Sequence, residues 1–193
     1  MADKPDQRRS DRHLRADAQR SEDAVLEAAK AVFATSGVDA PVREIAAKAG
    51  VGMGTLYRRF PKRADLVAAV FRREVDACAA AAPALAAEYA PGEALGRWLQ
   101  RYAEFIATKT GLSAALHSGD PAFDTRPAYF RASFEPALAG LLDAAAAAGQ
   151  MRRDIAPYDL LRAVGNLSVA DREHTSRMVD LMVDGMRFGA GKA

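Results

Sequence analysis

The sequence predicts an all-α fold. Alanine, leucine, arginine and glutamate, which favour helices, are abundant along the 193 residues. Runs of β-branched residues are few, and no segment alternates polar and apolar residues as a strand would. Glycine and proline separate segments whose apolar residues recur at helical spacing. We therefore expect about nine helices, and because half of the residues are hydrophobic the chain can bury a core.

The N-terminal segment, residues 1–19, is polar and charged, and we expect a flexible arm there. Ser21 can cap a first helix over residues 21–36, with Glu22 and Asp23 in its first turn. A glycine at position 37 then ends this helix.

Residues 42–60 carry the most informative pattern. A short helix from Val42 to Ala49 is interrupted by Gly50-Val51-Gly52, because glycine reaches the conformations that a tight corner needs. In a second helix, from Met53 to Phe60, Leu56 and Phe60 face inward at i, i+4 spacing. The residues expected to face outward are Thr55, Tyr57, Arg58 and Arg59. Two short helices joined by a glycine turn, with hydroxyl and guanidinium groups on the second, are typical of a helix-turn-helix that reads duplex DNA.

The rest of the chain continues as helices separated by proline and glycine. The expected ranges after Pro61 are 62–82, 93–108, 111–118, 127–148, 157–169 and 173–188. Pro83 and Pro91-Gly92 bound a linker, and Pro136 is expected to kink the helix that contains it.

Charge is distributed unevenly, although the net charge is only +2. Residues 1–73 contain 15 Lys and Arg against 10 Asp and Glu, and residues 74–193 contain 12 against 15. The basic part therefore contains the helix-turn-helix, as phosphate binding requires. Ordinary scatter of solvated charges is the alternative. The arginines of the N-terminal arm alternate with aspartates, so the arm either enters the minor groove of DNA or is a solubilising tail.

Several other classes of protein are disfavoured. No run approaches the roughly 18 apolar residues of a membrane span and the N-terminus lacks the apolar segment of a secretory signal, so we expect no membrane partner. The single cysteine, Cys78, excludes an intrachain disulfide, suits a reducing cytoplasm and lies on an apolar helical face. The three histidines, His13, His117 and His174, are far apart, and no nucleophile or nucleotide-binding motif occurs. We expect no catalysis, no cofactor and no metal.

The order of a helix at 21–36 followed by VREIAAKAGVGMGTLYRRFPKRADLVAAVF resembles the TetR (tetracycline-repressor-like) family of bacterial transcriptional regulators. The resemblance covers about residues 20–71 and includes V-R-E-I-A, A-G-V, G-T-L-Y and an F-P pair. It implies an N-terminal three-helix helix-turn-helix DNA-binding domain, residues 20–61. A long helix would join it to a helical effector-binding and dimerisation domain, residues 62–189.

The resemblance also implies which residues contact DNA. The helix from Met53 to Phe60 would be the recognition helix, and its N-terminal tip would enter the major groove first. The candidate DNA contacts are Arg43, Gly52, Met53, Gly54, Thr55, Tyr57, Arg58 and Lys62. Arg43 and Lys62 stand at the starts of two helices, where free N–H groups also favour an anion. Tyr57 can pack inside instead, and Arg59 and Arg63 are either contacts or plain solvated charges.

The family's regulatory half implies a small-molecule effector, a homodimer and a palindromic operator. The effector is expected to be apolar or aromatic, because the candidate pocket residues are Trp98, Tyr102, Phe105, His117, Phe123, Tyr129, Phe130 and Phe134. A packed aromatic core without a ligand fits the same spacing. The candidate dimer residues are Leu160, Leu161, Val164, Leu167, Ser168, Met178, Leu181, Met182 and Met186. The alternative function is a helical ligand- or protein-binding dimer with only nonspecific DNA affinity.

Overall fold

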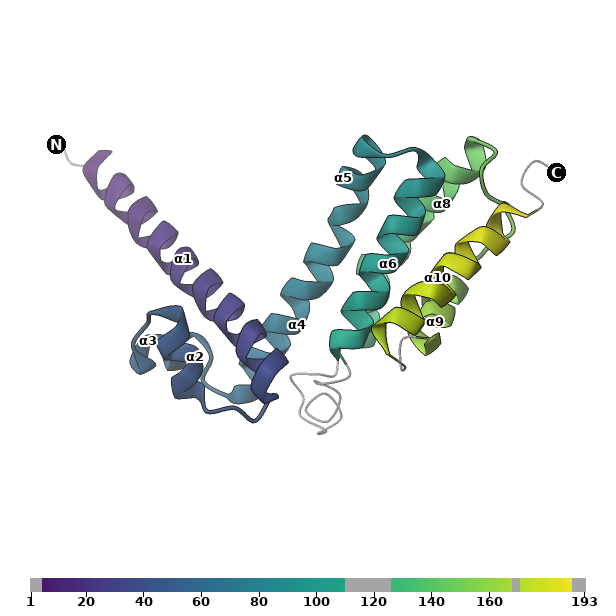
Figure 1. Ribbon diagram of the computed structural model, residues 1–193. Helices are drawn as coiled ribbons and strands as arrows, with labels where there is room; N and C mark the ends of the chain where they lie inside the picture. The colour runs from purple at the N-terminus through teal and green to yellow at the C-terminus, as the bar shows by residue number, and fades with distance from the viewer. Residues whose placement is uncertain (1–4, 110–125, 168–170, 189–193) are drawn as a thin grey trace. The chain divides into compact units, whose positions relative to one another are not determined.

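The computed structural model describes residues 5–109, 126–167 and 171–188 (Figure 1). Its regular elements are α-helices, and no strand occurs in these three ranges, so the all-α prediction is confirmed. The helices are α1 (Pro5–Ser36), α2 (Val42–Ala49), α3 (Met53–Arg59), α4 (Arg63–Ala79), α5 (Ala81–Glu88), α6 (Pro91–Lys109), α8 (Arg126–Ala147), α9 (Pro157–Leu167) and α10 (Arg172–Arg187). The helix predicted at residues 111–118 lies outside the described ranges. None of the described helices is long and apolar enough to cross a membrane.

The N-terminal arm is a correction to the sequence prediction. Figure 1 shows α1 as one long helix that begins at Pro5, so residues 5–19 continue the helix that was expected to start at Ser21. Between Pro5 and Gly37 the chain contains neither proline nor glycine, and arginine, alanine, glutamine and leucine favour a helix there. Pro5 suits the first turn, where its missing N–H has no intrahelical partner. Ser21 therefore lies within the helix and is not its cap.

The chain divides into two compact units, Met1–Val70 and Phe71–Ala193. The division falls inside α4, whereas the sequence placed it at residues 61–62. The first turns of α4 belong to the first unit. Arg63 donates to the carbonyl oxygens of Val38 and Ala40, at 2.8 Å for the latter, and these bonds tie the start of α4 to the loop between α1 and α2.

The first unit has a small core made mainly by α1 and α2, which pack against each other. The apolar residues that recur at helical spacing along α1 are all buried: Val25, Ala28, Ala29, Val32 and Phe33. Ile45 and Ala46 of α2 are buried as well.

The segment after α4 is a second correction. The sequence predicted one helix to residue 82 and then a linker, but α4 ends at Ala79 and α5 runs from Ala81 to Glu88. Pro83 does not break α5, because it occupies the third position of the helix, where an N–H would have no intrahelical partner.

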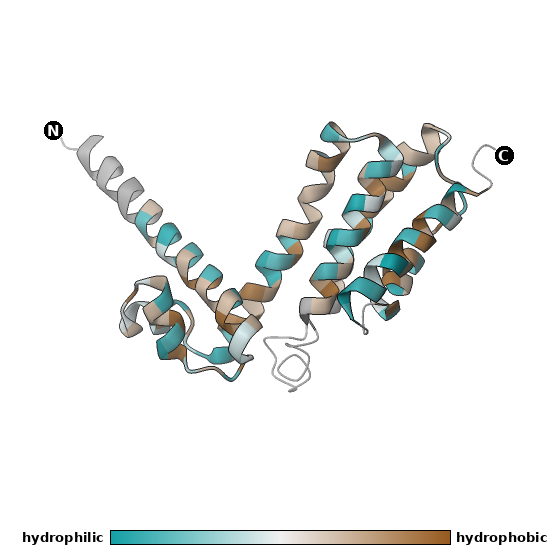
Figure 2. Ribbon diagram, viewed as in Figure 1, coloured by the Kyte–Doolittle hydropathy of each residue, from teal (hydrophilic) through white to brown (hydrophobic). Residues whose placement is uncertain are grey.

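The second unit is built around α6, which packs against α5, α8, α9 and α10. Four of its residues, Leu95, Trp98, Leu99 and Tyr102, are almost completely buried. Figure 2 shows hydrophilic and hydrophobic residues interleaved along α6 and α10, as expected for helices with one buried side. The N-terminus of α10 is capped by Asp171, whose carboxylate accepts the N–H of His174 at 2.8 Å.

Candidate functional site

The turn of the helix-turn-helix depends on two glycines with different conformations. Gly50 ends α2 with a φ of 67°, in the left-handed region that side chains disfavour. Gly52 precedes α3 with an extended backbone, φ −71° and ψ 149°, and provides no side-chain cap. The inward prediction for α3 is confirmed, because Leu56 is 1% and Phe60 6% exposed.

The N-terminal tip of α3 is open. Gly52, Met53 and Gly54 are all exposed, and a Cβ atom added to either glycine meets no atom within 4 Å. Neither glycine has a positive φ. Packing and backbone conformation therefore do not require glycine at 52 or 54, although Gly54 costs the helix about 0.5–1 kcal/mol relative to alanine. The backbone of α3 is therefore uncovered at its N-terminal tip.

The outward face of α3 carries polar groups that are available to a partner. Tyr57 does not pack inside, since 48% of its surface is exposed. No hydrogen bond joins its hydroxyl to another described residue. Arg58 Nη2 donates to Thr55 Oγ1 at 3.1 Å, so these two groups lie together on the surface one turn apart. Exposed guanidinium and hydroxyl groups of this kind can contact phosphate oxygens and base edges.

Arg43 and Lys62 are exposed at the starts of α2 and α4, as predicted. The backbone N–H of Lys62 is not free for an anion, because it donates to Asp65 Oδ2 at 3.0 Å. A carboxylate three residues into a helix commonly closes this bond. Only the side chain of Lys62 remains available for a phosphate.

The structure assigns contacts to the two arginines whose roles the sequence left open. Arg63 holds the loop before α2, as described above. Arg59 donates through Nε to Glu22 Oε2 at 2.7 Å and forms an ion pair with it through Nη2. The two residues are 37 positions apart, so no local spacing could have revealed the contact.

The aromatic residues of the second unit pack against one another. Trp98 stacks on Tyr102 with ring centroids 5.7 Å apart and planes inclined by 6°, and Phe134 meets Tyr102 edge to face at 5.1 Å. Phe105 and Phe130 complete the cluster, with each ring within 6.4 Å of Tyr102. His117 and Phe123 lie outside the described ranges.

The polar atoms of this aromatic cluster already have partners inside the chain. The indole N–H of Trp98 donates to the carbonyl of Cys78 at 3.0 Å, and the Tyr102 hydroxyl donates to the carbonyl of Leu161 at 3.3 Å. The Tyr129 hydroxyl donates a hydrogen bond to the carboxylate of Asp76 on α4. Burial raises the pKa of Tyr102 well above its usual value and raises that of Cys78 to about 12. The Cys78 thiol is therefore protonated at neutral pH, as expected for a core cysteine.

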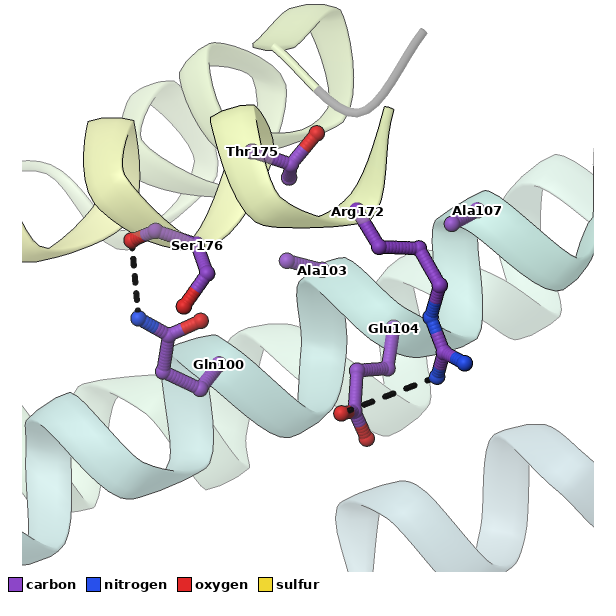
Figure 3. Close-up of a pocket in the computed structure, with 7 residues that line it drawn as sticks. All are labelled: Gln100, Ala103, Glu104, Ala107, Arg172, Thr175 and Ser176. Atoms are coloured by element: carbon purple, nitrogen blue, oxygen red, sulfur yellow. Dashed lines mark hydrogen bonds and ion pairs between the residues drawn. The ribbon is translucent and has the colours of Figure 1, made fainter. Parts of the chain in front are cut away.

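A small polar notch lies between α6 and α10 (Figure 3). Its volume is about 50 Å³, far below the roughly 300 Å³ at which small-molecule pockets begin. Gln100 donates to the carbonyl of Ser176 at 3.0 Å and to Asp180 Oδ1 at 2.7 Å, and Arg172 lies 3.7 Å from Glu104. These contacts connect α6 to α10, and the notch between the helices is too small for an aromatic effector.

The apolar residues predicted for a dimer interface divide into two groups. Leu160, Leu161, Val164 and Met186 are buried within the single chain, so their surface is not offered to a partner. The others are at least partly exposed in the described ranges, with Met178, Met182 and Leu167 half-buried and Leu181 65% exposed; Ser168 lies outside those ranges. The sequence reasoning missed Phe188, which is 82% exposed and directly follows α10. Among the described residues, no group of three or more His, Cys, Asp and Glu could hold a metal ion.

Two profiles of known protein families match the chain. Residues 25–70 match the profile described as bacterial regulatory proteins, tetR family, and residues 90–188 match that of the C-terminal domain of SbtR-like transcriptional regulators. The chain belongs to the TetR family of bacterial transcriptional regulators. None of the curated proteins is similar enough to count as a match.

Solved structures agree with this assignment. A TetR transcriptional regulator from Streptomyces coelicolor is 39% identical, with 86% of this chain and 98% of that chain covered and a TM-score of 0.74. A TetR transcription regulatory protein from Mycobacterium vanbaalenii is 36% identical, with 90% and 99% covered and a TM-score of 0.71. A gamma-butyrolactone receptor, described as ArpA-like, shares the fold at 22% identity, with 88% and 89% covered and a TM-score of 0.59.

Proposed function

We propose that this protein is a sequence-specific DNA-binding repressor that acts as a homodimer and leaves a palindromic operator when a small-molecule effector binds. The observation that carries the DNA-reading part is the open tip of α3. Neither packing nor backbone conformation requires glycine at positions 52 and 54 in the free protein. The two glycines flank the exposed Met53 at the N-terminal end of α3, and the corresponding helix enters the major groove in helix-turn-helix proteins.

The candidate contacts then have separate roles. Thr55 and Arg58, which lie together in the free protein, would exchange their mutual hydrogen bond for base edges or phosphates. Tyr57 would donate its hydroxyl to a phosphate, while Arg43 and Lys62 would contact the backbone on either side of α3. The exposure of all five side chains, partial for Thr55, is consistent with these roles.

The proposed homodimer uses the side of α10 that the chain leaves uncovered. The buried side of this helix consists of Thr175, Val179, Val183 and Met186. A second apolar stripe follows helical spacing on another side: Met178, Leu181, Met182 and Gly185. Two-fold pairing through this stripe would cover Leu181 and present two copies of α3 to two half-sites of a palindrome.

The proposed effector acts on the second unit. The described aromatic residues fill the space among themselves, so an apolar or aromatic molecule would have to displace rings of the cluster to bind among them. The fold is compatible with a receptor for small molecules, since a gamma-butyrolactone receptor shares it. Movement of α8 would be transmitted directly to α4 through the bond between Tyr129 and Asp76. Such coupling is typically about 1–3 kcal/mol.

The proposed function is tested by selecting random duplex DNA with the purified protein at moderate salt and sequencing the survivors. A two-fold symmetric consensus, preferred by about 10³-fold or more over random DNA, is expected. Folded protein that enriches no sequence would contradict the proposal and favour a helical dimer with another partner, because nonspecific binding depends on salt but not on sequence. Compounds that release the selected operator then identify the effector.

A further inference from the structure

The recognition helix α3 is held by few contacts on its buried side. It has seven residues, and its core anchors are Leu56 within the helix and Phe60 directly after it. These anchors are four residues apart, so they lie one above the other along a single line of the helix. Two anchors on one line resist sliding and tilting well, but they resist rotation of the helix about its axis poorly.

Side-chain packing does not fill the space between α3 and α1. A groove of about 290 Å³ separates the two helices, and its lining residues are Ala18, Ser21, Glu22, Val25, Thr55, Arg58, Arg59 and Phe60. Because this space is open, apolar contacts across it cannot fix the rotation of α3.

The bond between Arg59 and Glu22 spans this groove. Arg59 is the last residue of α3 and adjoins Phe60, so around the helix axis its side chain leaves about 60° from Leu56 and about 100° from Phe60. It reaches Glu22 through two nitrogen atoms. Both nitrogens converge on one carboxylate oxygen, Glu22 Oε2, in a charge-assisted contact that ties the end of α3 to α1. Glu22 belongs to α1, whose buried face packs against α2.

We propose that the ion pair between Glu22 and Arg59 is a positioning device that fixes the rotation of α3 and thereby the sequence selectivity of DNA binding. The proposal rests on the DNA-reading function of α3. A rotation of about 10° moves side-chain tips, which lie about 5–6 Å from the helix axis, by about 1 Å. A displacement of that size is enough to lengthen a hydrogen bond to a base edge beyond its useful range.

The pair sets selectivity without being important for stability. Arg59 is 55% and Glu22 21% exposed in their side chains, and pairs that are open to water contribute little to the free energy of folding. Loss of the pair would therefore leave the protein folded and still attracted to phosphate, with its reading groups displaced.

The experiment compares Glu22→Ala with Asp17→Ala. Both changes remove one carboxylate from α1, but Asp17 forms an ion pair with Arg20 on its own helix. The affinity for the selected operator and for random duplex of the same length is measured for each variant, and thermal unfolding verifies the fold. We expect Glu22→Ala to lower the operator-to-random ratio by about tenfold, as for one misplaced base contact, and Asp17→Ala to leave it unchanged. Glu22→Gln, which preserves the side-chain volume, replaces Glu22→Ala if the latter unfolds.

A charge exchange separates positioning from direct phosphate binding. Arg59→Glu should lose selectivity, and the double variant Glu22→Arg with Arg59→Glu should regain it, because the pair is restored with opposite polarity. If Arg59 instead contacts a phosphate, the double variant stays as defective as Arg59→Glu. In both variants the slope of log affinity against log salt concentration then falls by about 1 for each DNA-bound helix-turn-helix. A double variant that stays defective overturns the proposal, and so does a Glu22→Ala protein whose operator-to-random affinity ratio equals that of the parent. A parent protein without any preferred sequence overturns the DNA-reading function itself.

Discussion

Replacing Gly54 with alanine should make the protein more stable and at the same time a weaker DNA binder. Gly54 is the second residue of α3, its φ is not positive, and an added Cβ meets no atom within 4 Å. The methyl group therefore introduces no strain, and it reduces the conformational freedom of the unfolded chain. The expected gain is about 0.4–1 kcal/mol. For a chain of this length that raises the midpoint of thermal unfolding by about 1–4 °C.

The same methyl group occupies the surface through which the tip of α3 would approach the floor of the major groove. Displacing one good base contact costs about 1–3 kcal/mol, which is roughly 5-fold or more in affinity for each half-site. Thermal unfolding by circular dichroism measures the first effect, and a titration of the selected operator measures the second.

Gly50→Ala provides the matched control. Gly50 lies four residues before Gly54 and also has open space around it, but its φ of 67° is in the left-handed region. Alanine there costs roughly 1–2 kcal/mol, so this variant should be less stable. A Gly54→Ala protein that is stabilised and binds the operator as the parent does would refute the reasoning, because room for DNA would then not explain the glycine.

Three further predictions follow from exposure and burial. Tyr57→Phe removes only a hydroxyl without a described partner; fluorescence anisotropy should show a loss of about 2- to 10-fold on operator and random DNA alike, with unchanged thermal stability. Leu181→Glu puts a charge on the exposed stripe of α10; analytical ultracentrifugation should show folded monomers, and a persisting dimer would exclude this stripe as the interface. Because burial raises the pKa of Cys78 to about 12, its reaction with an aromatic disulfide reagent at pH 8 should be far slower in the folded than in the denatured protein; equal rates would place the thiol at the surface.

Local sequence patterns were sufficient to predict much of the structure of the first unit. The apolar face of α1, the glycine corner at Gly50 and the inward pair Leu56 and Phe60 all follow from spacing within one or two helical turns. Helix boundaries were less predictable. The start of α1 was missed because Pro5 and Ser21 are each compatible both with the first turn of a helix and with a loop. The break at Ala80 was missed because Pro83, which lies in the first turn of α5, also suits the start of a linker.

Contacts between distant residues could not be read from spacing. The roles of Arg59 and Arg63 depend on partners 37 and at least 23 positions away, and the Tyr102 hydroxyl donates to a carbonyl 59 positions away. The apolar residues of α9 and α10 illustrate the same limit. Helical spacing placed them on apolar faces, but only packing decided that Leu161 is buried within the chain and Leu181 remains exposed.

The sequence by itself determined the all-α class, the helix-turn-helix and the residues on the outward face of α3, because helix propensity, glycine conformation and apolar periodicity act over a few neighbouring residues. Tertiary structure alone decided which polar groups are already paired and which surface is left for a partner. The reason is physical: a guanidinium or a hydroxyl bonds with whatever group the fold brings within about 3 Å, and the fold brings together residues that the chain keeps far apart.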